Sequence, residues 1–164
     1  MTGGIKLKKR IYILGIVTFL IDQIVKLAVI RLIPINSIIK VIPNFLYLTF
    51  TKNTGGAFSI FDSYPYLLVI VGIMFLFIFT YYISKREDVN TFEVLSFGFI
   101  LGGIIGNLFD RIIRSGVVDF IGFIFGSYYF PVFNLADTFI VGGAILMVLD
   151  WFRGDINEFR SIRK

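Results

Sequence analysis

Two aspartates in the C-terminal half of the chain, Asp119 and Asp137, are the residues best suited to chemistry. Asp119 stands in the apolar run 117–120, and Asp137 ends the segment 133–137. No Lys or Arg occurs at positions 115–152, so neither carboxylate has a cation close to it in the sequence. If the two side chains meet in the fold, they share one proton, because two close carboxylates do not both ionise easily.

A carboxylate pair of this kind can hydrolyse an amide bond. The ionised member accepts a proton from water, and the protonated member donates a hydrogen bond to the carbonyl oxygen under attack. The chain contains no His and no Cys, which excludes Ser-His-Asp catalysis, thiolate nucleophiles and metals bound by imidazole or thiolate. A second interpretation stays open at this point, in which the aspartates pair with Arg111 or Arg114 in a purely structural network.

Further ionisable residues fall within long apolar stretches, where they are costly and need a reason. Asp22 and Lys26 lie four residues apart and share a helical face, which suits either an ion pair between helices or a role near a site. A later stretch carries a polar stripe toward one end, formed by Asn107, Asp110, Arg111 and Arg114.

Four apolar stretches must position these side chains. Hydrophobic residues make up 57% of the 164 residues and charged residues 16%, against about a quarter charged in an ordinary soluble domain. About 20 apolar residues span a bilayer as a helix. The sequence therefore predicts one domain over 1–164, a membrane all-α bundle with transmembrane helices at 11–30, 64–83, 92–113 and 130–151.

Glycines in the third stretch predict close helix packing. Gly98, Gly102 and Gly106 recur at a spacing of four with Gly103 alongside, which is the pattern of a small-residue helix contact. We expect this face to pack within the bundle, so we expect a monomer.

Basic residues set the expected orientation. They cluster at both chain ends and in the connection after the second stretch, as Lys6, Lys8, Lys9, Arg10, Lys85, Arg86, Arg153, Arg160, Arg163 and Lys164. By the positive-inside rule both termini are cytoplasmic, and the longer connections 31–63 and 114–129 face outward. The net charge of +5 suits anionic lipid headgroups more than nucleic acid.

The first outer connection is expected to form a small β-sheet between the first and second helices. Positions 45–50 are rich in β-forming residues, 53–56 are a turn signal, and 57–61 return as a second strand. The second outer connection, 114–129, is expected to be a loop.

Five motifs in order resemble those of the bacterial lipoprotein signal peptidases, or type II signal peptidases, along the whole chain. They are Asp22-x-x-x-Lys26, Asn53-x-Gly55-x-Ala57-Phe58, Gly102-Gly103-x-x-x-Asn107-x-x-Asp110-Arg111, Val117-Val118-Asp119-Phe120 and Phe133-Asn134-x-Ala136-Asp137. The resemblance implies an aspartic endopeptidase of the bacterial plasma membrane. It would cleave diacylglyceryl-modified prolipoproteins on the N-terminal side of the lipidated lipobox cysteine.

The same resemblance implies roles for individual residues. Asp119 and Asp137 would be the catalytic dyad, near the extracytoplasmic face, and Asp22 and Lys26 would support the site or the fold. Substrate-binding positions would be Asn53, Gly55, Gly103, Asn107, Arg111, Asn134 and Ala136. No metal or cofactor is implied, and the partners would be lipid-modified prolipoproteins and membrane lipids.

The residue types suggest three other functions. A transporter or channel would line an ion path with intramembrane charges, but these gather toward one half of the predicted bundle. A magnesium-dependent phosphotransferase would need several converging carboxylates, and only Asp110 lies near Asp119 and Asp137. A Ser–Lys peptidase would need a serine close to Lys26, for which Ser59 or Ser115 is available.

Overall fold

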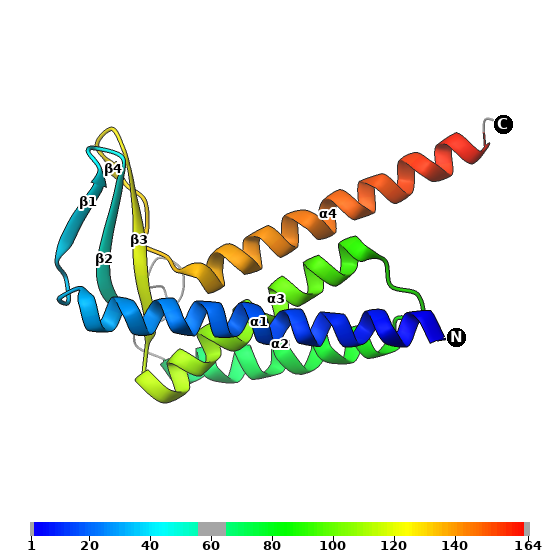
Figure 1. Cartoon of the computed structure of the whole chain (residues 1–164), viewed down its shortest axis with the longest axis horizontal. Coiled ribbons are helices and arrows are strands. Elements are labelled where there is room, and N and C mark those ends of the chain that lie inside the picture. The colour runs from blue at the N-terminus through cyan, green and yellow to red at the C-terminus, as the bar shows by residue number, and fades with distance from the viewer. Residues whose placement is uncertain (1, 56–64, 163–164) are drawn as a thin grey trace.

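The computed structural model describes residues 2–55 and 65–162 (Figure 1). This part of the chain forms α1 (Thr2–Leu32), α2 (Pro65–Lys85), α3 (Thr91–Arg114) and α4 (Leu135–Ile162), with strands β1 (Ile38–Ile42), β2 (Leu46–Asn53), β3 (Val117–Phe125) and β4 (Tyr128–Tyr129). The strands gather at one end of the helices, which we call the sheet end. The opposite end, which we call the far end, contains the start of α1, the α2–α3 connection and the end of α4.

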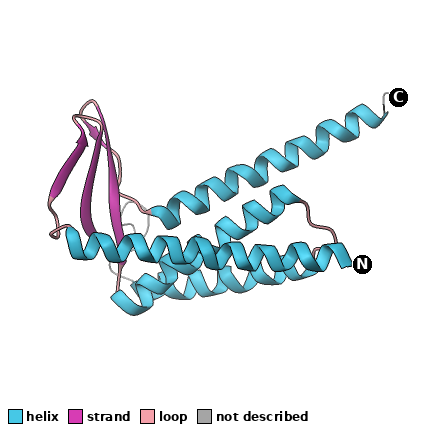
Figure 2. Ribbon diagram, in the orientation of Figure 1, coloured by secondary structure: helices cyan, strands magenta, loops and turns pink. Residues whose placement is uncertain are grey.

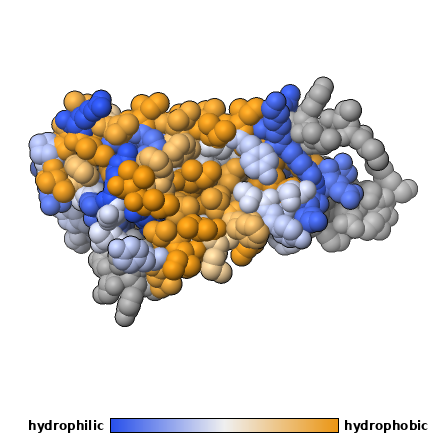
Figure 3. Space-filling model, turned by 90° about the horizontal axis from the view of Figure 1, so that it is seen from below, coloured by the Kyte–Doolittle hydropathy of each residue, from blue (hydrophilic) through white to orange (hydrophobic). Residues whose placement is uncertain are grey.

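The four predicted apolar helices are confirmed. Segments long and apolar enough to cross a membrane are Leu7–Leu32, Tyr66–Lys85, Thr91–Arg114 and Leu135–Arg153. Figure 3 shows hydrophobic residues filling the middle of one face, with hydrophilic residues toward both ends. Because such a band would be costly in water, it fits the hydrocarbon layer.

The fourth helix begins later than predicted. Positions 130–134 were expected to be helical, but Phe133 extends beside β3 instead, where its carbonyl accepts the N–H groups of Phe120 and Ile121. The prediction was wrong here because apolar character alone does not separate a buried extended segment from a helix.

Helix α3 lies at the centre of the bundle and packs against α1, α2 and α4. Its glycine face meets α1: a Cβ at Gly98 would lie 2.7 Å from Leu14, and one at Gly106 would lie 2.6 Å from Asp22 Oδ2. Gly103 instead faces α4, where a Cβ would meet the Ala136 carbonyl. The glycine pattern therefore allows close helix contacts within one chain, as expected from the sequence.

The sheet differs from its prediction. Its order is β1-β2-β3-β4, all antiparallel, so half of it comes from the segment after α3 (Figure 2). The sheet is thus not confined to the connection between α1 and α2, and 114–129 is not a loop. Val117–Phe125 is a strand because its first residues are buried and pair with β2. The second strand expected at 57–61 lies outside the described residues.

Candidate active site

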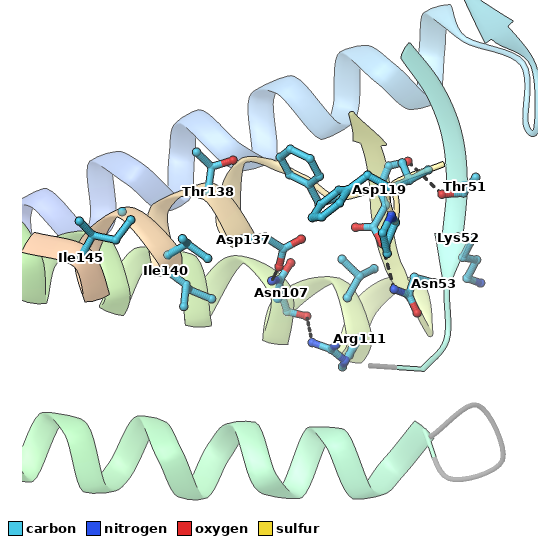
Figure 4. Close-up of a pocket in the computed structure, with 17 residues that line it drawn as sticks. Thr51, Lys52, Asn53, Asn107, Arg111, Asp119, Asp137, Thr138, Ile140 and Ile145 are labelled. Atoms are coloured by element: carbon cyan, nitrogen blue, oxygen red, sulfur yellow. Dashed lines mark hydrogen bonds between the residues drawn. The ribbon is translucent and has the colours of Figure 1, made fainter. Parts of the chain in front are cut away.

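A cavity of about 920 Å³ opens where the sheet meets α3 and α4 (Figure 4). Its polar lining includes Asn53 from β2, Asn107 and Arg111 from α3, Asp119 from β3 and Asp137 from α4. The two aspartates that the sequence singled out therefore line one cavity, although they belong to different elements.

Asp119 is held by two amide groups. Its side chain lies in β3 with only 3% of the residue exposed. Asn53 Nδ2 donates to Asp119 Oδ2 at 3.0 Å, and Asn134 Nδ2 donates to Asp119 Oδ1 at 2.7 Å. Both carboxylate oxygens are therefore fixed by neutral donors, one from β2 and one from the residue before α4.

Burial raises the pKa of Asp119 from 3.8 to about 6. This value of about 6 already includes a smaller rise from the negative charge of Asp137, and it includes the lowering of the pKa by the hydrogen bonds from Asn53 and Asn134 and by the charge of Lys26. Burial removes water that would solvate the anion, so the desolvation effect dominates. The protonation state of Asp119 therefore changes close to neutral pH.

Asp137 is fixed by the first turn of α4. Asn134 is the cap of this helix: its Oδ1 accepts the Asp137 N–H at 2.9 Å, and Asp137 Oδ2 accepts the Asn134 N–H at 3.1 Å. This reciprocal pair is a capping box. The other oxygen, Asp137 Oδ1, accepts from Asn107 Nδ2 at 2.7 Å.

Among the described side chains, at positions 7–55 and 66–153, no Lys or Arg lies within ion-pair distance of Asp119 or Asp137. Arg114 pairs with Asp110, and Arg111 donates to the carbonyls of Asn107 and Gly55, each at 3.4 Å. Neither arginine therefore forms a direct ion pair with Asp119 or Asp137 among the described side chains, although the charges of both aspartates act on Arg111.

The predicted substrate-binding residues divide into two groups. Asn53, Asn107 and Arg111 line the cavity. The others lie behind it or beside it: Asn134 and Ala136 are fully buried, Gly103 packs against Ala136, and the buried Gly55 offers its carbonyl to Arg111. Neither Asn53 Oδ1 nor Arg111 Nε has a hydrogen-bond partner among the described residues.

Lys26 is completely buried and contacts Asp22, Asp110 and Asn107. No serine is among its partners in the described residues, and Ser59 lies outside them. The described residues also hold no group of three or more acidic side chains suited to a metal ion. The Ser–Lys and magnesium interpretations thus find no site in this part of the chain.

The residues predicted from the sequence did not include the apolar wall of the cavity. It is formed by α4 beyond Asp137, through Ile140, Val141 and Ile145. The signal was available in the spacing, since Asp137, Val141 and Ile145 recur every four residues and so share one helical face. The missed set also includes Thr51, Lys52, Val117, Phe130, Pro131, Val132, Phe133, Thr138 and Gly142.

These features define a class, a membrane protein of four apolar helices with a paired-carboxylate site beside its sheet. A family model described as Signal peptidase (SPase) II matches residues 14–153, and the chain belongs to this family. It is therefore a membrane peptidase.

Curated relatives agree with this assignment. The lipoprotein signal peptidases of Listeria monocytogenes serotype 4a (strain HCC23) and of Listeria innocua serovar 6a are each 36% identical over 144 residues. Each alignment covers 88% of this chain and 94% of the relative.

Two solved structures, each described as a bacterial membrane enzyme, share the fold. One has a TM-score of 0.80 at 29% identity and covers 88% of both chains. The other has a TM-score of 0.75 at 29% identity and covers 85% of this chain and 90% of its own.

Proposed function

We propose that this peptidase removes signal peptides from lipid-modified prolipoproteins by an aspartyl mechanism, with Asp119 and Asp137 as the catalytic dyad. The observation that carries the proposal is the meeting of these two carboxylates in one cavity, each held by amides rather than by a cation. The names of the curated relatives support the substrate class.

In the proposed reaction the dyad holds one proton. The ionised carboxylate removes a proton from a water molecule, whose oxygen attacks the scissile carbonyl carbon. The protonated carboxyl donates a hydrogen bond to the carbonyl oxygen and stabilises the negative charge that develops there. The tetrahedral intermediate collapses when the dyad returns a proton to the leaving amide nitrogen, which breaks the C–N bond and restores the starting protonation. A pKa of about 6 for Asp119 suits this exchange near neutral pH.

Three side chains in the lining are proposed to bind the substrate backbone. Asn107 and Arg111 face the cavity from α3, and Asn53 faces it from β2. Donors in these positions can hold carbonyl oxygens of an extended peptide, and holding the peptide fixes the scissile bond against the dyad. The sheet around positions 53–58 is proposed to cover the substrate and limit water, although positions 56–58 lie outside the described residues.

The apolar wall of α4 is proposed to receive the lipid-anchored part of the substrate. Val141 and Ile145 are exposed and continue from Asp137 along the cavity. Acyl chains or an apolar signal-peptide helix on this wall would hold the bond on the N-terminal side of the diacylglyceryl-modified cysteine beside the carboxylates. Anchoring of this kind needs no deep aqueous cleft.

We also propose that the enzyme lies in the bacterial plasma membrane as a monomer, with the sheet end extracytoplasmic. The far end carries the basic residues Lys8, Lys9 and Arg10 near the start of α1, Lys85 at the end of α2 and Arg86 just after it. The positive-inside rule assigns this end to the cytoplasm. The dyad then faces the side on which exported proteins are cleaved.

The test is cleavage of a diacylglyceryl-modified lipobox peptide by purified protein in detergent with a chelator present. Asp119→Asn and Asp137→Asn should each lower kcat by at least about 10³-fold, since each removes one half of the dyad. Asp88→Asn, a change at an exposed aspartate of the α2–α3 connection, should leave cleavage unchanged. Retained cleavage in either dyad variant, or loss of wild-type cleavage in chelator, would contradict the mechanism. An unmodified peptide cleaved equally well would contradict the lipid requirement.

A further inference from the structure

Behind the cavity, α1 and α3 share three charged side chains that are fully buried. Lys26 Nζ lies 2.9 Å from Asp22 Oδ2 and 3.0 Å from Asp110 Oδ2, and the three side chains have 0% exposure. We call Asp22, Lys26 and Asp110 the buried triad. Gly106 permits it, because a side chain there would collide with Asp22. A buried ion pair costs desolvation and often stabilises a fold no better than apolar residues do. The buried triad therefore calls for a role beyond stability.

Each acid of the buried triad also accepts a hydrogen bond from a main-chain N–H of the residue that precedes one of the dyad aspartates. Asp110 Oδ2 accepts the N–H of Val118 at 3.1 Å, and Val118 immediately precedes the aspartate of β3. Asp22 Oδ1 accepts the N–H of Ala136 at 2.9 Å, and Ala136 immediately precedes the aspartate of α4. The two segments that carry the dyad come from different parts of the chain, and the buried triad is a fixed point common to both.

Hydrogen bonds through two side-chain amides link the cation of the buried triad to Asp119 and Asp137. Lys26 Nζ donates to Asn107 Oδ1 at 3.2 Å, and Asn107 Nδ2 donates to Asp137. Asn107 Oδ1 also accepts from Asn134 Nδ2 at 3.1 Å, and that same Nδ2 donates to Asp119. The lysine thus orients the amide of Asn107 directly, because a carbonyl oxygen turned toward an ammonium group leaves the amide NH₂ turned toward Asp137. It acts on Asn134 only through Asn107, whose oxygen accepts from the Asn134 NH₂.

A glutamine and an arginine bind the buried triad into one unit. Gln23 Nε2 donates to Asp22 Oδ2 at 3.1 Å and to Asp110 Oδ1 at 3.2 Å, so it bridges the two acids. Arg114 pairs with Asp110 and donates to Gln23 Oε1 at 2.8 Å. Two anions and two cations therefore balance within this group.

We infer that the buried triad is a charged clamp that positions both catalytic aspartates and sets the electric field at the dyad, with Asp110 as much a positioning residue as Asp22. The inference rests on the proposed dyad mechanism. The charged groups around the dyad in the described chain are Asp22 and Lys26 of α1, Lys52 of β2, and Asp110, Arg111 and Arg114 of α3.

This inference predicts that removal of the cation of the buried triad and removal of either anion shift the pH profile of cleavage in opposite directions. The charge of Lys26 lowers the pKa of Asp119, so its removal moves the pH profile of cleavage to higher pH. Removal of a negative charge at Asp22 or Asp110 moves the profile to lower pH, because a neighbouring anion favours a protonated carboxyl. A general loss of stability would not produce shifts of opposite sign.

The experiment measures kcat and KM for the diacylglyceryl peptide from mildly acidic to mildly alkaline pH, using the full chain in detergent. Lys26→Met should shift the profile up by about 0.5 pH unit, and Asp22→Asn and Asp110→Asn should shift it down by a similar amount. Each should lower kcat by about 10–100-fold through misplaced carboxylates. KM should stay within about twofold, since the α4 wall is unchanged. Glu93→Gln is the control, because it removes a buried carboxylate of the same helix at the far end.

Arg114→Gln keeps the inference testable if the variants of the buried triad do not fold. This side chain is partly exposed and its charge lies next to Asp110, so its removal should give a smaller shift to higher pH. An unshifted profile in Arg114→Gln, shifts of one sign in all clamp variants, or an Asp110→Asn variant that behaves like Glu93→Gln would overturn the clamp. Asp119→Asn is run in parallel. Cleavage retained there would show that the dyad proposal itself had failed, and the clamp with it.

Discussion

Helices α3 and α4 begin with the same local structure at opposite ends of the molecule. In each, an asparagine caps the helix and an acid three residues later accepts the N–H of that asparagine. The pairs are Asn90 with Glu93 in α3 and Asn134 with Asp137 in α4. Both arrangements satisfy N–H groups that the start of a helix leaves without partners.

The two acids differ in the partner of their second carboxylate oxygen. Glu93 pairs with Arg86, and this ion pair ties the α2–α3 connection to α3. Asp137 accepts an N–H from the neutral Asn107 and lines a cavity with a second carboxylate. A charge partner leaves an acid with a structural task, whereas amide partners fix its position and leave its charge available. The same capping motif therefore serves stability at the far end and is suited to chemistry at the sheet end.

Substitution of the two capping asparagines should distinguish the structural role from the catalytic role most strongly. Asn134→Ala and Asn90→Ala should each destabilise the fold by about 1 kcal/mol through loss of a cap. Asn134→Ala should also lower kcat by about 10²-fold, because Asp119 loses one of its two amide donors and the dyad shifts. Asn90→Ala should leave kcat within about twofold. Thermal unfolding and peptide cleavage measure the two effects, and equal kcat losses in both variants would contradict the distinction.

The dyad should leave a pH-dependent signature on stability. With a pKa of about 6 in place of 3.8, Asp119 binds its proton more tightly in the folded chain than in the unfolded chain. Its contribution is fully present below pH 3.8 and is lost as pH rises through about 6, by up to about 3 kcal/mol.

Asp119→Asn removes this dependence, so the variant should become more stable than wild type as pH rises. The substitution can be accommodated, because Asn53 has an unpartnered Oδ1 that a flip of its amide would present to the new NH₂. Unfolding in detergent at several pH values measures the effect, with Asp88→Asn as the control. Stability curves for wild type and Asp119→Asn that run parallel with pH would contradict the raised pKa.

A smaller effect is expected from Asn53. Its Nδ2 lowers the pKa of Asp119, so Asn53→Ala should raise that pKa above about 6 and move the pH profile of cleavage upward. We expect a shift of about 0.5 pH unit and a fall in kcat of at most about tenfold. Thr51→Val is the matched control on the same strand, because the Thr51 hydroxyl donates to the backbone carbonyl of Asp119 and not to its carboxylate. A shift of equal size in both variants would rule out a direct effect on the carboxylate.

The smallest effect is expected from the acid at the far end. Glu93→Gln breaks an ion pair whose arginine side chain is 41% exposed, so the cost should be about 1 kcal/mol or less. Cleavage and its pH profile should match wild type. A large loss of activity in this variant would show that the two ends of the bundle are coupled, and the comparison of the caps would no longer hold.

The helices could be predicted from the sequence because membrane spans are local features. Continuous apolar stretches identify all four, and the glycine spacing of α3 predicts which helix packs closely. Helix boundaries were less certain, as at 130–134, where residues beside β3 are as apolar as a span.

The sheet and the details of the site depend on contacts between distant residues. Val117–Phe125 lacks the alternation of a half-buried strand because its first residues are all buried, so only its pairing with β2 identifies it. Asp119 and Asp137 could be proposed from their types and neighbours, but their meeting depends on that pairing. The contact between Asp110 and the Val118 N–H has no sequence signal, because it joins a helix to the backbone of the following strand.

The pairing of β2 with β3 also determines at what stage of synthesis the site can form. The two strands are separated by α2 and α3, so the sheet closes only after both helices have been synthesised and inserted. Asp137 follows later still, on the first turn of the last helix. A ribosome-bound chain therefore has no complete dyad while its earlier helices leave the insertion machinery. On the proposed dyad mechanism, cleavage by the new enzyme requires that its own integration be nearly finished.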